Sequence, residues 1–185
     1  MKKLLIILLV TTFGFNAHAQ EFDDSWQINA GFNTVGNLGT QNPLERLDEF
    51  GFRNPFIIGI EYRWAQEFSI EQDFSLNGFK KGVYLNDGIL TDNLTYFSTN
   101  TTVKWFFSDY LYNLDELELY IGGGVGLFHM DELNTSGNLS GGIQYWINDN
   151  LGIRLQTIGK FAVNHKDRQY ANNHWQHALQ VVYKL

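Results

Sequence analysis

Hydrophobic and polar side chains alternate with a period of two along most of this chain, and that period restricts the fold more than any other feature. In the stretch "WQINAGFNTV", Trp26, Ile28 and Phe32 fall on one face, whereas Gln27 and Asn29 fall on the other. A period of two is typical of a β-strand whose two faces meet different surroundings. The pattern therefore predicts an all-β chain in which each strand has one apolar and one polar face.

The same alternation returns in seven further runs of roughly ten residues, the length that a tilted strand needs to cross a bilayer. The eight predicted strands cover residues 26–35, 55–64, 67–76, 96–105, 117–127, 139–147, 151–161 and 174–185. Their number and length predict a barrel that crosses a membrane.

The predicted connections also alternate in length. The short connections are residues 65–67 and 148–150, and the long ones are residues 36–54, 80–91, 129–135 and 164–173. Short turns at one end and long loops at the other are typical of outer-membrane barrels. We therefore predict an eight-stranded antiparallel up-and-down transmembrane β-barrel with both termini on the periplasmic side.

Two connections have features of their own. The connection at residues 107–116 is long for a periplasmic turn, and the sequence leaves open whether it forms a helical turn or extends the flanking strands. In the first long connection, Asn42 stands as an N-cap, Pro43 at the first helical position and Gly51 as a stop. We expect a short surface helix there.

Residues 1–19 are expected to be an export signal. Lys2 and Lys3 precede an apolar run at residues 4–10, and Ala17 and Ala19 stand at the positions that a signal peptidase reads. The apolar run is too short to span a bilayer as a helix, which needs about 20 residues. We therefore assign residues 20–185 to one outer-membrane β-barrel domain.

Composition excludes several kinds of partner and site. Loss of Lys2 and Lys3 with the signal changes the net charge from −7 to −9, whereas a nucleic-acid partner favours a basic protein. Cysteine is absent, which excludes disulfides and thiolate metal sites. We expect a monomer that contacts outer-membrane lipid, with no nucleic-acid partner, no cofactor and no bound metal.

Aromatic residues indicate which face meets lipid. In the predicted topology, one group lies on the apolar face near the periplasmic end, and it comprises Trp26, Trp64, Phe68, Trp105 and Tyr183. A second group lies on the same face near the outer end, and it comprises Phe56, Phe97, Phe161 and Trp175. Two aromatic girdles are expected of a membrane barrel. A soluble periplasmic β-barrel that binds a ligand inside, with these aromatics in its core, is the alternative.

The opposite face carries nearly balanced charge. Its charged residues are Glu61, Arg63, Glu71, Asp73, Glu118, Lys104, Arg154, Lys160 and Lys184. An eight-stranded barrel is just wide enough for side chains to fill, so we expect a paired charge network in its lumen. The turn at residues 65–67 predicts that Glu61 faces Glu71. We therefore expect a cation between the two carboxylates, with Lys104 or Arg63 as the first choice.

The glycine-rich stretch "IGGGVG" raises the question of a phosphate-binding loop. Such a loop follows a strand and opens a helix, but this stretch lies inside a period-two run and leads to "LFHM". Gly122, Gly124 and Gly126 therefore belong to the lumen face, where we expect them to leave room for Tyr96, Trp146 and the charged residues.

Two segments, "GNLSGGIQYWINDNLGIRLQTIGKF" and "HWQHALQVVYKL", resemble the last two hairpins of OmpA-like barrels of Bacteroidetes outer-membrane proteins. The terminal strand ends with Val181, Tyr183 and Leu185 on the lipid face, similar to the signal that the barrel assembly machinery recognises. The resemblance implies an outer-membrane location and a barrel fold. Many members carry a peptidoglycan-binding domain after the barrel, and the sequence ends at Leu185, so we do not extend that cell-wall tether to this chain.

Histidines give little support for an enzyme. His174 and His177 are three residues apart on a strand and so lie on opposite faces. His129 with Asp131 and Glu132, like His165 with Asp167, is a weak pattern for a divalent cation in an outer loop. No His and Ser are placed together as a deacylase nucleophile requires.

The sequence therefore favours a small outer-membrane protein with a closed, charge-filled barrel and a structural or surface-presenting role through its outer loops. A narrow porin or solute channel is the first alternative. A lipid-modifying barrel enzyme and the soluble periplasmic binder are the others.

Overall fold

A computed structural model describes residues 24–36, 42–85, 88–111, 116–163 and 170–185. The expected export signal, residues 1–19, lies outside the described residues, as does the pair His165 and Asp167.

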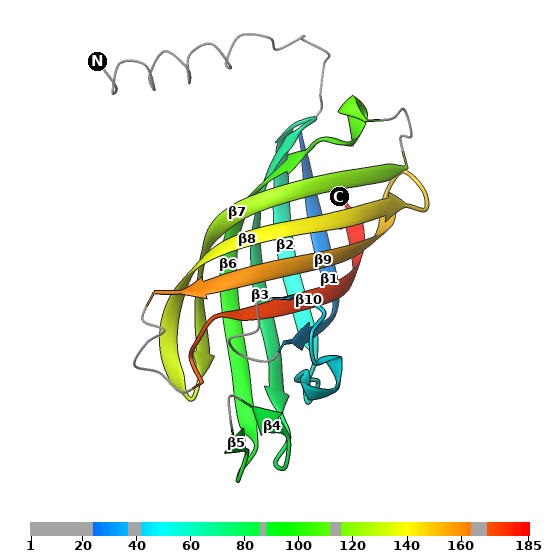
Figure 1. Cartoon of the computed structure of the whole chain (residues 1–185). Coiled ribbons are helices and arrows are strands. Elements are labelled where there is room, and N and C mark those ends of the chain that lie inside the picture. Colours follow the sequence, from blue (N-terminus) through cyan, green and yellow to red (C-terminus); the bar gives the residue numbers. More distant parts are fainter. Residues whose placement is uncertain (1–23, 37–41, 86–87, 112–115, 164–169) are drawn as a thin grey trace, which may run out of the picture.

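Eight strands close into a barrel, as the alternation predicted, and the predicted fold is confirmed (Figure 1). The barrel strands are β1 (Ser25–Val35), β2 (Phe56–Ala65), β3 (Phe68–Phe79), β6 (Leu94–Phe106), β7 (Leu117–Met130), β8 (Glu132–Trp146), β9 (Leu151–Ala162) and β10 (His174–Lys184). Each pairs antiparallel with its neighbours, and β1 closes the barrel on β10. A small hairpin of β4 (Tyr84–Leu85) and β5 (Gly88–Ile89) extends from the end of the barrel opposite the C-terminus, which the predicted topology makes the outer end.

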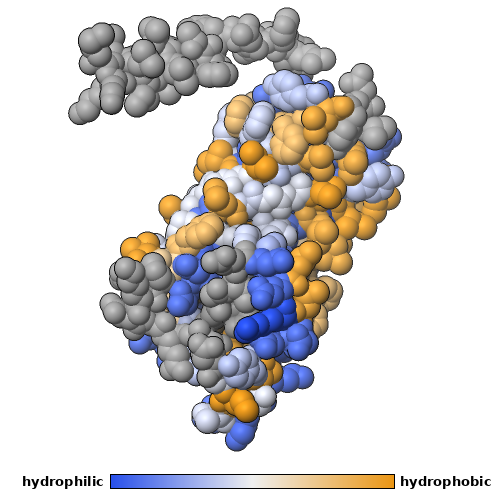
Figure 2. All heavy atoms as spheres, in the orientation of Figure 1, coloured by the Kyte–Doolittle hydropathy of each residue, from blue (hydrophilic) through white to orange (hydrophobic). Residues whose placement is uncertain are grey.

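The two faces of every strand differ as the sequence predicted. Along β2, for example, Ile58 and Ile60 are exposed on the outer wall, whereas Ile57 and Glu61 are buried in the lumen. Hydrophobic side chains cover the flank at the right of Figure 2, and hydrophilic ones gather toward the outer end at the bottom. Among the described residues, no helix is both long enough and apolar enough to cross a membrane.

The long outer connection predicted at residues 129–135 is wrong. β7 continues to Met130 and β8 begins at Glu132, so Asp131 alone makes the turn, with a φ of 67°. Asp accepts this left-handed conformation more readily than most residues. The strands extend because the alternation itself continues: Met130 and Asn134 are buried, whereas His129 is exposed.

The expected surface helix is reduced to a single short turn. Asn42 Oδ1 accepts the backbone N–H of Leu44 at 3.0 Å, which is the contact predicted of an N-cap, but the turn at residues 43–46 does not continue as an α-helix. Among the described residues of this loop, 42–55, the one regular element is the 3-10 helix η1 (Leu47–Glu49), which begins after Arg46 in the left-handed conformation. In the other uncertain connection, β6 ends at Phe106 and the 3-10 helix η2 (Ser108–Tyr110) follows; residues 112–115 are not described.

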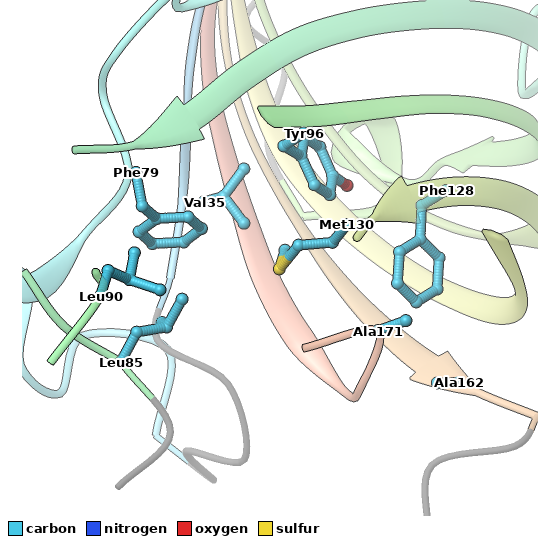
Figure 3. Packing of buried hydrophobic residues seen from close by; sticks show 9 residues of the cluster. All are labelled: Val35, Phe79, Leu85, Leu90, Tyr96, Phe128, Met130, Ala162 and Ala171. Carbon is cyan, nitrogen blue, oxygen red and sulfur yellow. The ribbon is translucent and has the colours of Figure 1, made fainter. Parts of the chain in front are cut away.

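An apolar cap fills the outer end of the lumen. It comprises Val35, Phe79, Leu85, Leu90, Tyr96, Phe128, Met130, Ala162 and Ala171, and all are buried. Figure 3 shows these side chains converging from several barrel strands and from the β4–β5 hairpin. This cap was not predicted from the sequence. Phe128 and Met130 are two and four residues after Gly126, so they lie on the same face of the strand as the lumen glycines. This spacing could have predicted that both side chains enter the lumen.

The glycines of β7 permit close backbone packing. The inward face of β7 carries the buried residues Tyr120 and Phe128, and it also carries Gly122, Gly124 and Gly126. A Cβ at Gly124 would lie 2.0 Å from the backbone oxygen of Thr101 on β6, which no repacking of side chains can relieve. These glycines therefore let β6 and β7 approach and curve in a small barrel.

The side chains beside these glycines differ from those we expected. A Cβ at Gly126 would lie 2.4 Å from Asn100 Oδ1, and one at Gly122 would lie 2.6 Å from Ser140 Oγ. Tyr96 and Trp146 are not among the nearest neighbours. The large aromatic ring near these glycines is that of Tyr120. It packs over a further glycine, Gly142, and a Cβ built at Gly142 would lie 2.4 Å from the Tyr120 side chain.

Replacing Gly124 with Leu should prevent most of the chain from folding, because the new Cβ collides with the Thr101 carbonyl. The folded fraction can be measured from the heat-dependent shift in gel mobility after refolding into lipid vesicles. Gly137→Leu is the matched control, since Gly137 is exposed on the outer wall and a Cβ there would meet no atom within 4 Å. Equal folded fractions for the two variants would show that β7 is not packed in this way.

Candidate functional site: the charged barrel interior

The centre of the lumen is built on two carboxylates that face each other. The turn between β2 and β3 pairs Glu61 directly with Glu71, as the sequence predicted. Lys104 lies on the neighbouring strand β6, and Arg154 reaches across the lumen from β9. Four strands therefore contribute to one cluster, which we call the central charge cluster and which comprises these four residues.

Every acid in the central charge cluster contacts both bases. Lys104 Nζ lies 2.8 Å from Glu61 Oε2 and 2.8 Å from Glu71 Oε2. Arg154 donates from Nη2 to Glu61 at 2.7 Å and from Nη1 to Glu71 at 2.9 Å. All four side chains have 0% exposure. Two negative and two positive charges make the cluster neutral, which is what a low-dielectric interior requires.

Neutral polar groups complete the bonding of the central charge cluster. Ser69 Oγ donates to Glu61 at 2.6 Å, and Asn29 Nδ2 donates to Glu71 at 2.7 Å. Gln144 Oε1 accepts from Arg154 Nε at 2.8 Å. The ring of Tyr120 lies 4.7 Å from Lys104 Nζ, so a cation–π contact adds to the ion pairs. These contacts fix the long side chains of the cluster in one arrangement.

A second ion pair closes the lumen nearer the periplasm. The predicted pairing of Arg63 with Glu61 and Glu71 is wrong, because Arg63 donates from Nη1 to Glu118 at 2.5 Å. Arg63 is two residues beyond Glu61 on the same face of β2, so it reaches the next layer. Glu118 also accepts Gln144 Nε2 and Trp146 Nε1, both at 2.9 Å.

A polar cavity of 690 Å³ opens beside the ion pair between Arg63 and Glu118. Lys184 lines this cavity with Gln27, Glu116 and Asp149, among other residues. The structure thus places Lys184 at the mouth of the barrel that the predicted topology assigns to the periplasm, away from the central charge cluster.

A third layer lies between the central charge cluster and the apolar cap. Asn100 joins Asp73 to Lys160, because Asn100 Nδ2 donates to Asp73 at 2.7 Å and Lys160 Nζ donates to Asn100 Oδ1 at 2.8 Å. Asp73 and Lys160 are each 1% exposed. This layer contributes one acid and one base, so it is neutral as well.

Tyr96 and His174 link this layer to the apolar cap. His174 Nδ1 lies 2.8 Å from the backbone oxygen of Asn172, to which it must donate. His174 Nε2 therefore accepts from the Tyr96 hydroxyl, at 3.0 Å. A neutral imidazole satisfies both contacts. His177 lies on the outward face and does not join His174, as the strand spacing predicted.

The predicted aromatic girdles lie on the outer wall. Trp26, Trp64, Phe68, Trp105 and Tyr183 are between 38% and 49% exposed near the periplasmic end. Phe56, Phe97 and Phe161 are exposed near the outer end, whereas Trp175 is half-buried against Gly159. Trp26 packs on Tyr62 with ring centres 4.8 Å apart. An apolar band between two aromatic girdles is the surface that a bilayer covers.

In the part of the chain that the structure describes, no group of three or more His, Asp or Glu side chains is arranged to hold a metal ion. The four side chains of the central charge cluster leave no surface exposed to water. Sequence reasoning missed the role of Arg154 as the second bridging cation, because its contact crosses the barrel.

The chain matches no protein-family model and has no significant sequence similarity to a curated protein. Solved structures of outer-membrane barrels share its fold. The N-terminal β-barrel domain of OprF from Pseudomonas aeruginosa is 14% identical, with a TM-score of 0.55 over 87% of this chain and 97% of that one. Neisserial surface protein A is 13% identical, with a TM-score of 0.54 over 88% and 97% of the two chains.

The outer membrane protein W of E. coli is similar to this chain as well. It is 13% identical, with a TM-score of 0.51 over 90% of this chain and all of that one. At such low identity the similarity establishes the fold. The chain is an eight-stranded antiparallel barrel of the kind that these outer-membrane proteins form.

Replacing Lys104 with Met should lower the free energy of unfolding by about 3–5 kcal/mol, because Glu61 and Glu71 then face each other with one cation fewer. Lys184→Met is the control: its half-buried side chain lies at the periplasmic mouth, and we expect a change within about 0.5 kcal/mol. Urea unfolding in lipid vesicles measures both. A similar loss for the two variants would contradict a special role of the central charge cluster.

Proposed function

We propose that this protein is a small integral outer-membrane protein whose barrel is closed and whose role is structural or surface-presenting, without catalysis. The fold, the apolar outer wall with its aromatic girdles and the outer-membrane barrels that share the fold support this location. The outer end carries the β4–β5 hairpin, which extends beyond the barrel and suits presentation to the exterior.

The observation that carries this proposal is the complete burial of the central charge cluster. Glu61, Glu71, Lys104 and Arg154 span the lumen from four strands and have no solvent-exposed surface. An open water path would expose at least part of these side chains. The apolar cap at the outer end adds a second barrier that ions cross only at high cost.

We further propose that the protein is related to the OmpA-like barrels of Bacteroidetes, functions as a monomer surrounded by outer-membrane lipid, and is inserted by the barrel assembly machinery. The last strand supports this. Val181, Tyr183 and Leu185 are all exposed on the outer wall of β10 and its end, as a recognition signal must be.

A narrow channel is the second candidate. Its support is the polar cavity of 690 Å³ at the periplasmic mouth, which reaches the ion pair between Arg63 and Glu118. A channel needs this ion pair, the central charge cluster and the apolar cap all to rearrange. The closed barrel needs no rearrangement, so we favour it.

Conductance in planar bilayers distinguishes the two candidates. We expect no steady current from the purified protein, because the central charge cluster spans the lumen and is fully buried. A steady current that Arg154→Gln or Lys104→Gln abolishes in barrels that remain folded would assign the protein as a channel instead.

Labelling of intact cells tests the presentation of the outer end. Ile89 is 70% exposed at the β4–β5 hairpin, and Asp149 is exposed in the short turn at the opposite end. We expect a membrane-impermeant maleimide to label Ile89→Cys on intact cells and Asp149→Cys only after the outer membrane is permeabilised. The chain has no other cysteine. Labelling of Asp149→Cys alone on intact cells would reverse the orientation.

A further inference from the structure

The loop between β1 and β2 folds back against the outer wall of the barrel. On that wall, Thr34, His177 and Thr157 form a polar row across the neighbouring strands β1, β10 and β9. All three are half-buried, although they lie on the outward strand faces that carry the lipid-facing residues. We call residues 42–53 the collar, because this segment covers part of the row. In Figure 1 it lies, in cyan, at the outer end of the barrel.

Specific contacts hold the collar on this polar row. Thr34 Oγ1 donates to the backbone oxygen of Gly51 at 2.9 Å. His177 Nε2 lies 2.8 Å from the backbone oxygen of Pro43, to which it must donate. His177 Nδ1 then accepts from Thr157 Oγ1 at 2.9 Å. The Phe50 ring stacks on His177 with ring centres 5.5 Å apart and planes within 1°. The collar therefore satisfies polar groups that lipid would leave without partners.

In the proposed topology, these contacts lie at the level of the membrane. Trp175 belongs to the outer aromatic girdle, and β10 runs from the outer end toward the periplasm. His177 is two residues farther along β10 on the same face, which is roughly 5 Å deeper for a strand tilted by about 40°. The backbone of Pro43 and the ring of Phe50, which contact His177, thus reach below the outer girdle. A loop that only extended into external water would not contact the wall there.

The outward surface of the collar is rich in large apolar side chains. Leu44 is 66% exposed, Leu47 is 58% exposed and Phe52 is 60% exposed. The charges between them include the ion pair of Arg46 with Glu49, at 3.8 Å. Exposed apolar side chains interspersed with charges suit a segment that lies in the plane of a membrane interface.

We infer that the collar is an interfacial anchor: residues 42–53 lie in the outer leaflet, with Leu44, Leu47 and Phe52 in contact with lipid, and are not presented to the exterior. This inference rests on the proposed membrane location of the barrel. It divides the outer end into two parts, because the β4–β5 hairpin extends into water whereas the collar stays on the bilayer.

Environment-sensitive fluorescence tests the anchor directly. A single cysteine at Leu47, Ile89 or Leu139 can carry an NBD fluorophore, since the chain has no native cysteine. Leu139 is 63% exposed on the barrel wall and reports on lipid, whereas Ile89 reports on water. In phosphatidylcholine vesicles, we expect iodide to quench the probe at position 47 several-fold less than the probe at 89. Lipids spin-labelled near the headgroup should quench position 47 strongly.

The three positions separate failure of the inference from failure of the proposed function. If the probe at 139 is quenched by lipid while the probe at 47 is as accessible to iodide as that at 89, the anchor is wrong. If the probe at 139 is also accessible to iodide, the membrane location itself is wrong, and the anchor with it.

Removal of the His177 contact provides a second test. In the Leu47→Cys background, His177→Ala should increase iodide quenching at position 47, because the collar loses its bond to Pro43 and its stacking partner. His129→Ala is the matched control, since His129 is exposed on β7 at another part of the wall. The heat-dependent gel shift verifies that both variants fold. No difference between them in iodide quenching would show that His177 does not hold the collar on the wall.

Discussion

The interior of this barrel depends on one electrostatic constraint: Glu61 and Glu71 face each other across the β2–β3 ladder, with no exposure to water. Two carboxylates in that position are tolerated only if cations neutralise them. Lys104 and Arg154 do so, each with a contact to both acids. Because Arg154 comes from β9, the same contacts tie opposite sides of the barrel together. Closure of the lumen is thus a consequence of charge neutralisation.

The other layers follow the same rule. Arg63 and Glu118 form a neutral pair toward the periplasm, and Asp73 and Lys160 form another toward the outer end, joined through Asn100. The acidic excess of the chain therefore lies outside these layers. Small residues set the space available, since the backbones of β6 and β7 approach closely at Gly124.

Much of this arrangement could be predicted from the sequence because β-structure has simple periodicity. Alternation gave the faces of all eight barrel strands, and the short turn at residues 65–67 gave the register of Glu61 with Glu71. Contacts across the lumen were harder. Arg154 is 93 residues from Glu61, and their contact depends on barrel closure and on side-chain length.

Errors arose where local composition outweighed periodicity. His129, Asp131 and Glu132 looked like a polar loop, although the alternation continues through them and Asp131 alone makes the turn. The helix signals at Asn42 and Pro43 were overridden by tertiary contacts, because Pro43 is bonded to His177 on the wall.

A double-mutant cycle between Glu71 and Lys104 tests the central claim most directly. The free energy of unfolding would be measured for the parent protein, Glu71→Gln, Lys104→Met and the double variant in the same vesicles. If neutralisation of the facing carboxylates holds the interior together, the double variant should be more stable than Lys104→Met alone, with a coupling of roughly 1–3 kcal/mol. Simple addition of the two losses would contradict the account.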